Sequence, residues 1–158
     1  ILKLKNKGEG LEIFLSSVTD PYQGLEAKYK ITRQCLEILS DYGFKGCVSI
    51  LTKSNMVLRD IDIFKKLQNV VVGLTMTSTT NSISRYFEKN APNVLDRFAA
   101  LEELNKNGIR TYAFVGPLLP HFVAFESEVE NIFKKLKEPN IKETTPEPYP
   151  NSKIFPIS

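Results

Sequence analysis

The chain has 158 residues, of which 42% are hydrophobic and 25% are charged, a balance typical of a globular domain and not of a disordered or fibrous chain. Its formal net charge of +3 does not by itself argue for a nucleic-acid partner, because a lysine-rich surface gives the same balance. No apolar run approaches the ~20 residues of a membrane span, and two cysteines without CxxC spacing do not make a disulfide scaffold, so we expect a cytoplasmic protein.

The first strand–helix unit is the clearest pattern in the chain. Leu11–Val18 is nearly all apolar, which predicts a strand buried on both faces of a parallel sheet. The strand ends at Thr19 and Asp20, and a helical pattern follows over Pro21–Tyr42. The apolar positions of this helix predict a buried face made of Ile31, Cys35, Ile38, Leu39 and Tyr42, which makes Cys35 a core residue.

Three further units follow the same order. The predicted strands are Cys47–Leu51, Val70–Thr75 and Ile109–Val115, and the predicted helices are Met56–Leu67, Ile83–Asn107 and Phe125–Lys137. Pro92 is expected to split the long helix, because the residue before a proline disfavours the α conformation. The expected buried positions are Val94, Phe98, Leu101 and Leu104 in its second half, and Val129, Phe133 and Leu136 in the last helix.

Residues 1–137 are therefore predicted to form an α/β domain of about four parallel strand–helix units. An open doubly wound sheet and part of a (β/α) barrel both fit this order. No GxGxxG and no GxxxxGK[ST] is present, which argues against dinucleotide and P-loop sites. Residues 138–158 contain five prolines and no periodicity, which predicts an extended tail.

Polar residues follow the first three predicted strands, where a βα-repeat protein places its site. They are Ser16, Ser17, Thr19 and Asp20, then Thr52, Lys53 and Ser54, then Thr75, Thr77 and Ser78. A carboxylate from Asp20 and an ammonium from Lys53 at one rim suit a zwitterionic ligand. The alternative is that Asp20 caps the following helix with Pro21 in its first turn, which is common at helix starts.

Three segments carry a resemblance to a known family. They are SSVTDPYQ at residues 16–23 with Thr32-Arg33 downstream, TKS at 52–54 with LRD at 58–60, and VVVGLT at 70–75. Over residues 3–120 the chain resembles the radical S-adenosylmethionine (SAM) superfamily, in the branch of spore photoproduct lyase and DNA repair photolyase-like proteins. The resemblance implies a partial radical SAM (β/α) barrel, of the TIM-barrel type, with SAM bound across the strand tips.

The resemblance also assigns roles to individual residues. It implies that Ser17, Thr19 and Asp20 hold the SAM amino group and that Lys53 meets its carboxylate. The resemblance also implies a ribose contact on the strand of Gly73 and Thr75, which would come from Thr75 or from the backbone, because Gly73 has no side chain. The implied SAM-binding set is Ser17, Thr19, Asp20, Thr52, Lys53, Ser54 and Thr75.

Such an enzyme would cleave SAM reductively with a [4Fe–4S] cluster and abstract a hydrogen atom from a substrate, and DNA enters as a partner by family analogy alone. The CxxxCxxC loop that holds the cluster is absent from this sequence, and Cys35 and Cys47 are too few to replace it. We therefore expect an internal piece of such an enzyme, covering strands two to five, that is inactive alone and supplies no metal ligand. One alternative is a truncated, non-catalytic homologue that acts as a SAM-binding or scaffolding module. Another is an unrelated barrel enzyme with a phosphate-type ligand at the tips.

Three other residues carry weaker signals. Glu88 and Arg97 could reach the SAM rim, but surface salt bridging is the commoner role of such residues on a long helix. His121 is the one histidine of the sequence, and a loop-lining role is expected for it because one histidine does not make a metal site.

Overall fold

The computed structural model describes residues 4–16, 18–79, 86, 88, 91–117 and 125–137. Within these ranges the chain forms a four-stranded sheet in the order β1-β2-β3-β4, with every neighbouring pair parallel. The strands are β1 (Glu12–Leu15), β2 (Cys47–Thr52), β3 (Val70–Met76) and β4 (Arg110–Val115). The predicted α/β class and the predicted sequence of parallel units are thus confirmed.

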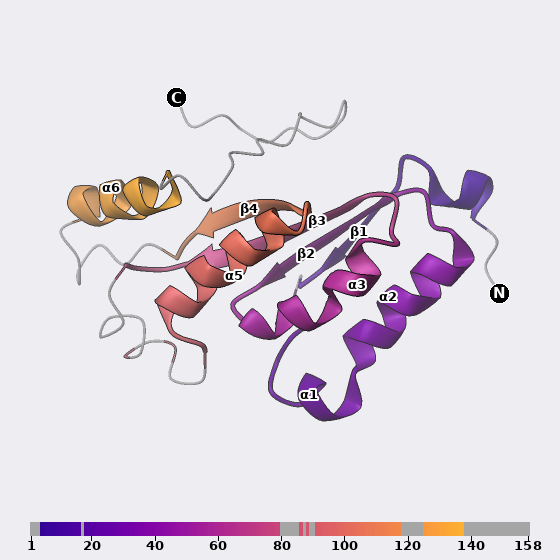
Figure 1. Ribbon diagram of the computed structural model, residues 1–158, viewed down its shortest axis with the longest axis horizontal. Coiled ribbons are helices and arrows are strands. Elements are labelled where there is room, and N and C mark those ends of the chain that lie inside the picture. The colour runs from indigo at the N-terminus through magenta and orange to yellow at the C-terminus, as the bar shows by residue number, and fades with distance from the viewer. Residues whose placement is uncertain are drawn as a thin grey trace.

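Helices alternate with these strands. They are η1 (Lys5–Gly8), α1 (Glu26–Tyr29), α2 (Ile31–Tyr42), η2 (Asn55–Asp60), α3 (Ile61–Phe64), α5 (Val94–Lys106) and α6 (Phe125–Leu136). In Figure 1, α2, α3 and α5 lie on the same side of the sheet. Helix α5 contacts β3, β4 and η2, and α3 contacts α2, so these helices form one layer. A sequential strand order with the crossover helices on one side follows when every crossover has the same hand.

The core lies between β3 and this helical layer. All seven residues of β3 are buried, as a central strand with neighbours on both sides requires. The expected face of α5 is confirmed, because Val94, Phe98, Leu101 and Leu104 are all buried. Helix α5 begins after Pro92, where the Asn93 side chain accepts a 2.9 Å hydrogen bond from the backbone N–H of Asp96.

The prediction for the first strand was wrong in length and in burial. Strand β1 covers Glu12–Leu15, and its burial alternates along the strand. Phe14 is 44% exposed, and Val18, which the sequence pattern had included in the strand, is 91% exposed. The reason is that β1 lies at the edge of the described sheet, where it pairs with β2 alone among the described strands. An apolar sequence does not guarantee burial at such an edge.

The predicted helix over Pro21–Tyr42 was also wrong. Residues 21–25 form turns, and α1 is separated from α2 by Lys30, which has a left-handed conformation with φ of 52°. The expected buried face of α2 is confirmed in part: Leu39 and Tyr42 pack against the core, but Cys35 is exposed and Ile38 is 67% exposed. Leu36 is the buried residue instead. Arg33, three residues before Leu36, is half-buried and pairs with Asp60 at 3.0 Å.

The last helix needs a smaller correction. In α6 the fully buried residue is Ile132, whereas Phe133, which was expected to be buried, is 50% exposed. The predicted tail at residues 138–158, His121 and Ser17 lie outside the described residues. Among the helices that the structure describes, none is long and apolar enough to cross a membrane.

Candidate functional site at the strand tips

A groove with a volume of about 270 Å³ lies at the carboxyl ends of the strands. Its lining combines residues from the ends of all four strands: Ser16, Val18, Thr19, Asp20, Leu51, Thr52, Lys53, Thr75, Phe114, Gly116 and Pro117. Parallel strands bring their carboxyl ends to one edge, which is why segments far apart in sequence meet here. This volume is slightly below the ~300–1,000 Å³ range of ligand pockets, so the groove suits one end of a larger ligand.

Asp20 joins the tips of β1 and β2. Its carboxylate accepts hydrogen bonds from the Thr52 hydroxyl at 2.6 Å, from the backbone N–H of Lys53 at 2.8 Å and from the backbone N–H of Tyr22 at 2.8 Å. The predicted alternative, a cap on a helix that starts at Pro21, is wrong because no helix begins there. A carboxylate has about four acceptor positions, so these bonds leave room for roughly one further donor.

The end of β2 is fixed by the two hydroxyl residues on either side of Lys53. The Thr52 hydroxyl accepts a bond from the backbone N–H of Ser54 at 2.9 Å while it donates to Asp20. The Ser54 side chain accepts from the backbone N–H of Met56 at 3.2 Å and so caps η2. Thr52 lines the groove, whereas Ser54 is buried and supports the turn behind it.

Lys53 belongs to a second group of charges, which we call the tip cluster: Lys53, Glu88 and Arg97. The Lys53 ammonium lies 3.4 Å from one carboxylate oxygen of Glu88, and the other oxygen lies 2.6 Å from the Arg97 guanidinium. The expectation that Glu88 and Arg97 form a surface salt bridge was wrong, because Arg97 has no exposed side-chain area. The Lys53 side chain is 36% exposed, so the cluster reaches from the core to the groove.

The β3 side of the groove has Thr75 as its polar residue. Gly73, two positions earlier, lies beneath the ring of Tyr112, and a Cβ atom added at Gly73 would lie 2.3 Å from that ring. The glycine is therefore needed for the close approach of Tyr112. Directly after β1, Ser16 at the groove edge has a φ of 116°, a conformation that residues other than glycine rarely adopt.

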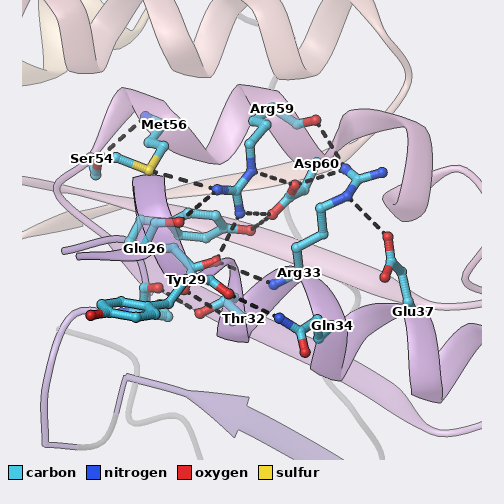
Figure 2. Close-up of polar contacts among 12 residues, drawn as sticks. Glu26, Tyr29, Thr32, Arg33, Gln34, Glu37, Ser54, Met56, Arg59 and Asp60 are labelled. Atoms are coloured by element: carbon cyan, nitrogen blue, oxygen red, sulfur yellow. Dashed lines mark hydrogen bonds and ion pairs between the residues drawn. The ribbon is translucent and has the colours of Figure 1, made fainter. Parts of the chain in front are cut away.

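Behind the groove lies a larger network, which we call the loop clamp: Tyr22, Glu26, Arg33, Arg59 and Asp60. Figure 2 shows Asp60 between Arg59 and Arg33, with Arg59 also facing Glu26. The Asp60 carboxylate accepts bonds from Arg59 Nε at 2.8 Å, from Arg33 Nη1 at 3.0 Å and from the Tyr22 hydroxyl at 3.0 Å. Asp60 itself has no exposed side-chain area.

Glu26 closes the loop clamp on its other side. Its carboxylate accepts a bond from Arg59 Nη2 at 2.9 Å and from the backbone N–H of Thr32 at 3.1 Å. Burial opposes ionisation of Asp60, but hydrogen bonds from Arg59 and Arg33 outweigh it and hold the pKa of Asp60 below its ordinary value. Burial, followed by the charge of Asp60, raises the pKa of Tyr22, so its hydroxyl remains a donor. The clamp ties the segment after β1 to the segment after β2.

The structure brings together most of the predicted SAM-binding residues. Thr19, Asp20, Thr52, Lys53 and Thr75 line one groove. Ser54 lies behind it, and Ser17 is outside the described residues. Sequence reasoning missed Phe114 and the buried role of Arg97. The Thr32-Arg33 and Leu58-Arg59-Asp60 motifs, which carried the resemblance without an assigned role, contribute to the loop clamp.

The described residues contain no group of three His, Cys, Asp or Glu side chains that could hold a metal ion. Cys35 is exposed on α2 and Cys47 is buried in β2. Because the sequence has no third cysteine, these residues do not fit a [4Fe–4S] cluster.

The chain is similar to a curated protein over most of its length. An uncharacterized protein of Methanocaldococcus jannaschii is 39% identical to this chain over 123 residues, which cover 78% of the chain and 46% of that protein. The chain thus spans about half the length of the curated relative that it matches. No protein-family model matches the chain, and no solved structure matches it.

Proposed function

We propose that this chain is the SAM-binding part of a radical SAM-type protein. The observation that carries the proposal is the groove at the strand tips, which Asp20 and Lys53 both line. The amino-acid end of SAM has an ammonium that needs acceptors and a carboxylate that needs donors. Asp20 has room for about one further donor, and Lys53 supplies a cation, so the groove is complementary to that end of the ligand.

The hydroxyl groups of the groove support the same assignment. Thr19, Thr52 and Thr75 each line it, and hydroxyls can both donate and accept hydrogen bonds. Leu51 and Phe114 supply the apolar part of the lining, and Phe114 is 49% exposed. A small, partly apolar groove with separated charges favours one end of an amphipathic ligand over a phosphate group, which would be repelled by Asp20.

The barrel belongs to this proposal as well. In the described sheet the strand order is sequential and α2, α3 and α5 lie on one side, as in a segment of a (β/α) barrel. A doubly wound sheet instead has helices on both faces and a reversal of strand order at its binding site. The position of the groove at the carboxyl ends of the strands agrees with where barrel proteins bind their ligands.

For this chain we propose SAM binding alone, because its own cysteines do not fit a [4Fe–4S] cluster. Reductive cleavage and hydrogen abstraction, with a DNA-type substrate by analogy, are proposed for a protein in which other residues supply the cluster. The lack of a fitting cysteine set supports a second candidate, a SAM-binding or scaffolding module that performs no such cleavage.

Calorimetric titration of SAM into the chain tests the proposal. Lys53→Ala removes the proposed cation and should weaken binding by ~1–3 kcal/mol, or about 5–150-fold, with little change in thermal stability. The matched control is Lys65→Ala, because Lys65 is an exposed lysine that donates to Asn107 and does not line the groove. Equal affinity in both variants, or no binding to the unaltered chain, would contradict the proposal.

A further inference from the structure

A second cavity, which we call the side pocket, lies next to the groove. Its volume is about 500 Å³, within the ~300–1,000 Å³ range of ligand pockets. Thr19 and Asp20 line both cavities, so molecules bound in the two would be neighbours. The wall of the side pocket is mostly apolar, and Leu25, Tyr29 and Ile31 contribute to it from the region of α1 and the start of α2.

The apolar side chains of this wall are exposed to a large extent. Leu25 is 67% exposed, Tyr29 is 52% exposed and Ile31 is 63% exposed. Single exposed apolar residues are normal, whereas several gathered around one cavity indicate a binding site. The Lys28 ammonium lies 5.2 Å from the centre of the Tyr29 ring and so takes one face of that ring. The other face remains for a ligand.

Bonds within the protein hold the side pocket in shape. Lys30, between α1 and α2, has a left-handed conformation with φ of 52°. The Thr32 hydroxyl donates to the backbone carbonyl of Pro21 at 2.6 Å, and the backbone N–H of Thr32 donates to Glu26 at 3.1 Å. The pocket is therefore preformed, and a ligand does not have to order its walls.

The polar groups of the side pocket differ in how far the protein satisfies them. Glu26 also accepts from the Arg59 guanidinium at 2.9 Å, which compensates its charge. Asp20 accepts its three hydrogen bonds from uncharged groups, so a negative charge remains at the edge shared with the groove. Within the described part of the chain, the side-chain amide of Gln23 has no hydrogen-bond partner. An amide presents a donor and an acceptor side by side, so Gln23 is complementary to a second amide.

We propose that the side pocket binds a neutral planar ring that carries an amide, with the ring against Tyr29 and Ile31 and the amide paired with Gln23. Aromatic and aliphatic walls favour a flat ring. The carboxylates of Asp20 and Glu26 disfavour an anion, since both line the pocket and the nearby Lys28 does not. This inference deepens the proposed function by naming the class of a second ligand, and it rests on that function where the ring is a substrate beside SAM.

NMR titration of benzamide into the isotope-labelled chain tests the wall of the pocket. We expect saturable shifts at the backbone amides of Leu25, Tyr29 and Ile31. Ile31→Ala should raise the Kd of benzamide by about threefold or more, because it removes apolar contact. The matched control is Ile38→Ala, because Ile38 is an isoleucine of the same helix that is 67% exposed and does not line the pocket. Equal Kd values in the two variants, or no saturable shift in the unaltered chain, would overturn the inference.

Two analogues of benzamide test the ligand class. Methyl benzoate keeps the ring and is neutral but lacks the N–H donor, whereas benzoate is an anion. The unaltered chain should prefer benzamide to each of them by about threefold or more. Gln23→Leu should still bind benzamide and methyl benzoate but should lose the preference between them, a change that a merely structural role of Gln23 would not cause. A preference that persists in Gln23→Leu would contradict the pairing, and equal binding of benzoate would contradict a neutral ligand.

Calorimetric titration of SAM into the same proteins separates this inference from the proposed function. If benzamide binds as expected and SAM does not bind, the proposed function fails and the side pocket stands as a ligand site. If SAM binds and benzamide does not, the inference is overturned and the proposed function stands.

Discussion

The two charged clusters of this molecule differ in exposure and in their position relative to the groove. In the loop clamp, Asp60 is fully buried and pairs with Arg33 and Arg59, and Arg33 also pairs with Glu37 and with the exposed Asp62. In the tip cluster, Lys53 is partly exposed and lines the groove. A buried carboxylate that is held by its partners stabilises the fold, whereas a partly exposed cation beside a groove is suited to a ligand. We therefore expect the clamp to act in stability, and we propose the tip cluster for binding.

The largest expected effect comes from breaking the loop clamp at its centre. Asp60→Asn leaves Arg33 and Arg59 without their shared buried carboxylate, and we expect a loss of about 3–5 kcal/mol in the free energy of unfolding. Urea denaturation monitored by circular dichroism measures it. The matched control is Asp62→Asn, because Asp62 pairs with the same Arg33 from a side chain that is 53% exposed, and we expect ~0–1 kcal/mol there. Equal losses of unfolding free energy in the two variants would contradict the view that the buried Asp60 stabilises the fold more than the exposed Asp62.

The second-largest effect is expected from acid, which should weaken the loop clamp. The native pKa of Asp60 is below its ordinary value of 3.8 and that of Glu26 is below 4.5. The unfolded chain therefore binds more protons in this range, so the stability from these groups is present above about pH 4.5 and is lost as pH falls through the lower native values. Urea midpoints measured from pH 6 down to about pH 2.5 should drop in the unaltered chain and drop less in Asp60→Asn. Parallel curves for the two would contradict the assignment.

The smallest effect tests the connection between the loop clamp and the groove. Tyr22 donates its hydroxyl to Asp60 in the clamp, and its backbone N–H to Asp20 at the groove. Tyr22→Phe removes the first contact and keeps the second, so we expect a loss of about 1 kcal/mol in stability with SAM affinity unchanged. Thermal unfolding and calorimetry on the same sample give both values. A large loss of affinity would show that the clamp reaches the ligand site.

Much of the fold follows from sequence pattern, because apolar runs and their spacing depend on local chemistry. The runs at Cys47–Leu51 and Val70–Thr75 correspond to strands β2 and β3, and the face of α5 is the expected one. The burial of β1 could not be predicted in this way, because burial depends on which strand lies at the edge of the sheet.

The corrections in α2 and at Arg97 have a different cause. Arg33 faces inward because it meets Asp60, which lies 27 residues further along the chain, and Arg97 is buried because it meets Glu88 and the carbonyl of Thr75. A periodicity argument treats an arginine as a surface residue, since arginine is almost never fully buried without a partner. The groove residues were predictable because polar groups at strand ends share one edge, but the partners that orient them come from tertiary contacts.

The sequential strand order also affects how the chain folds. Each strand pairs with the strand that precedes or follows it along the chain, and β1 pairs with β2 alone among the described strands. Closing a loop costs entropy that grows with its length, so pairing between neighbouring strands keeps each closure short. The sheet can therefore grow by one strand and its helix at a time from the β2–β3 pair, and no step requires distant parts of the sequence to meet first.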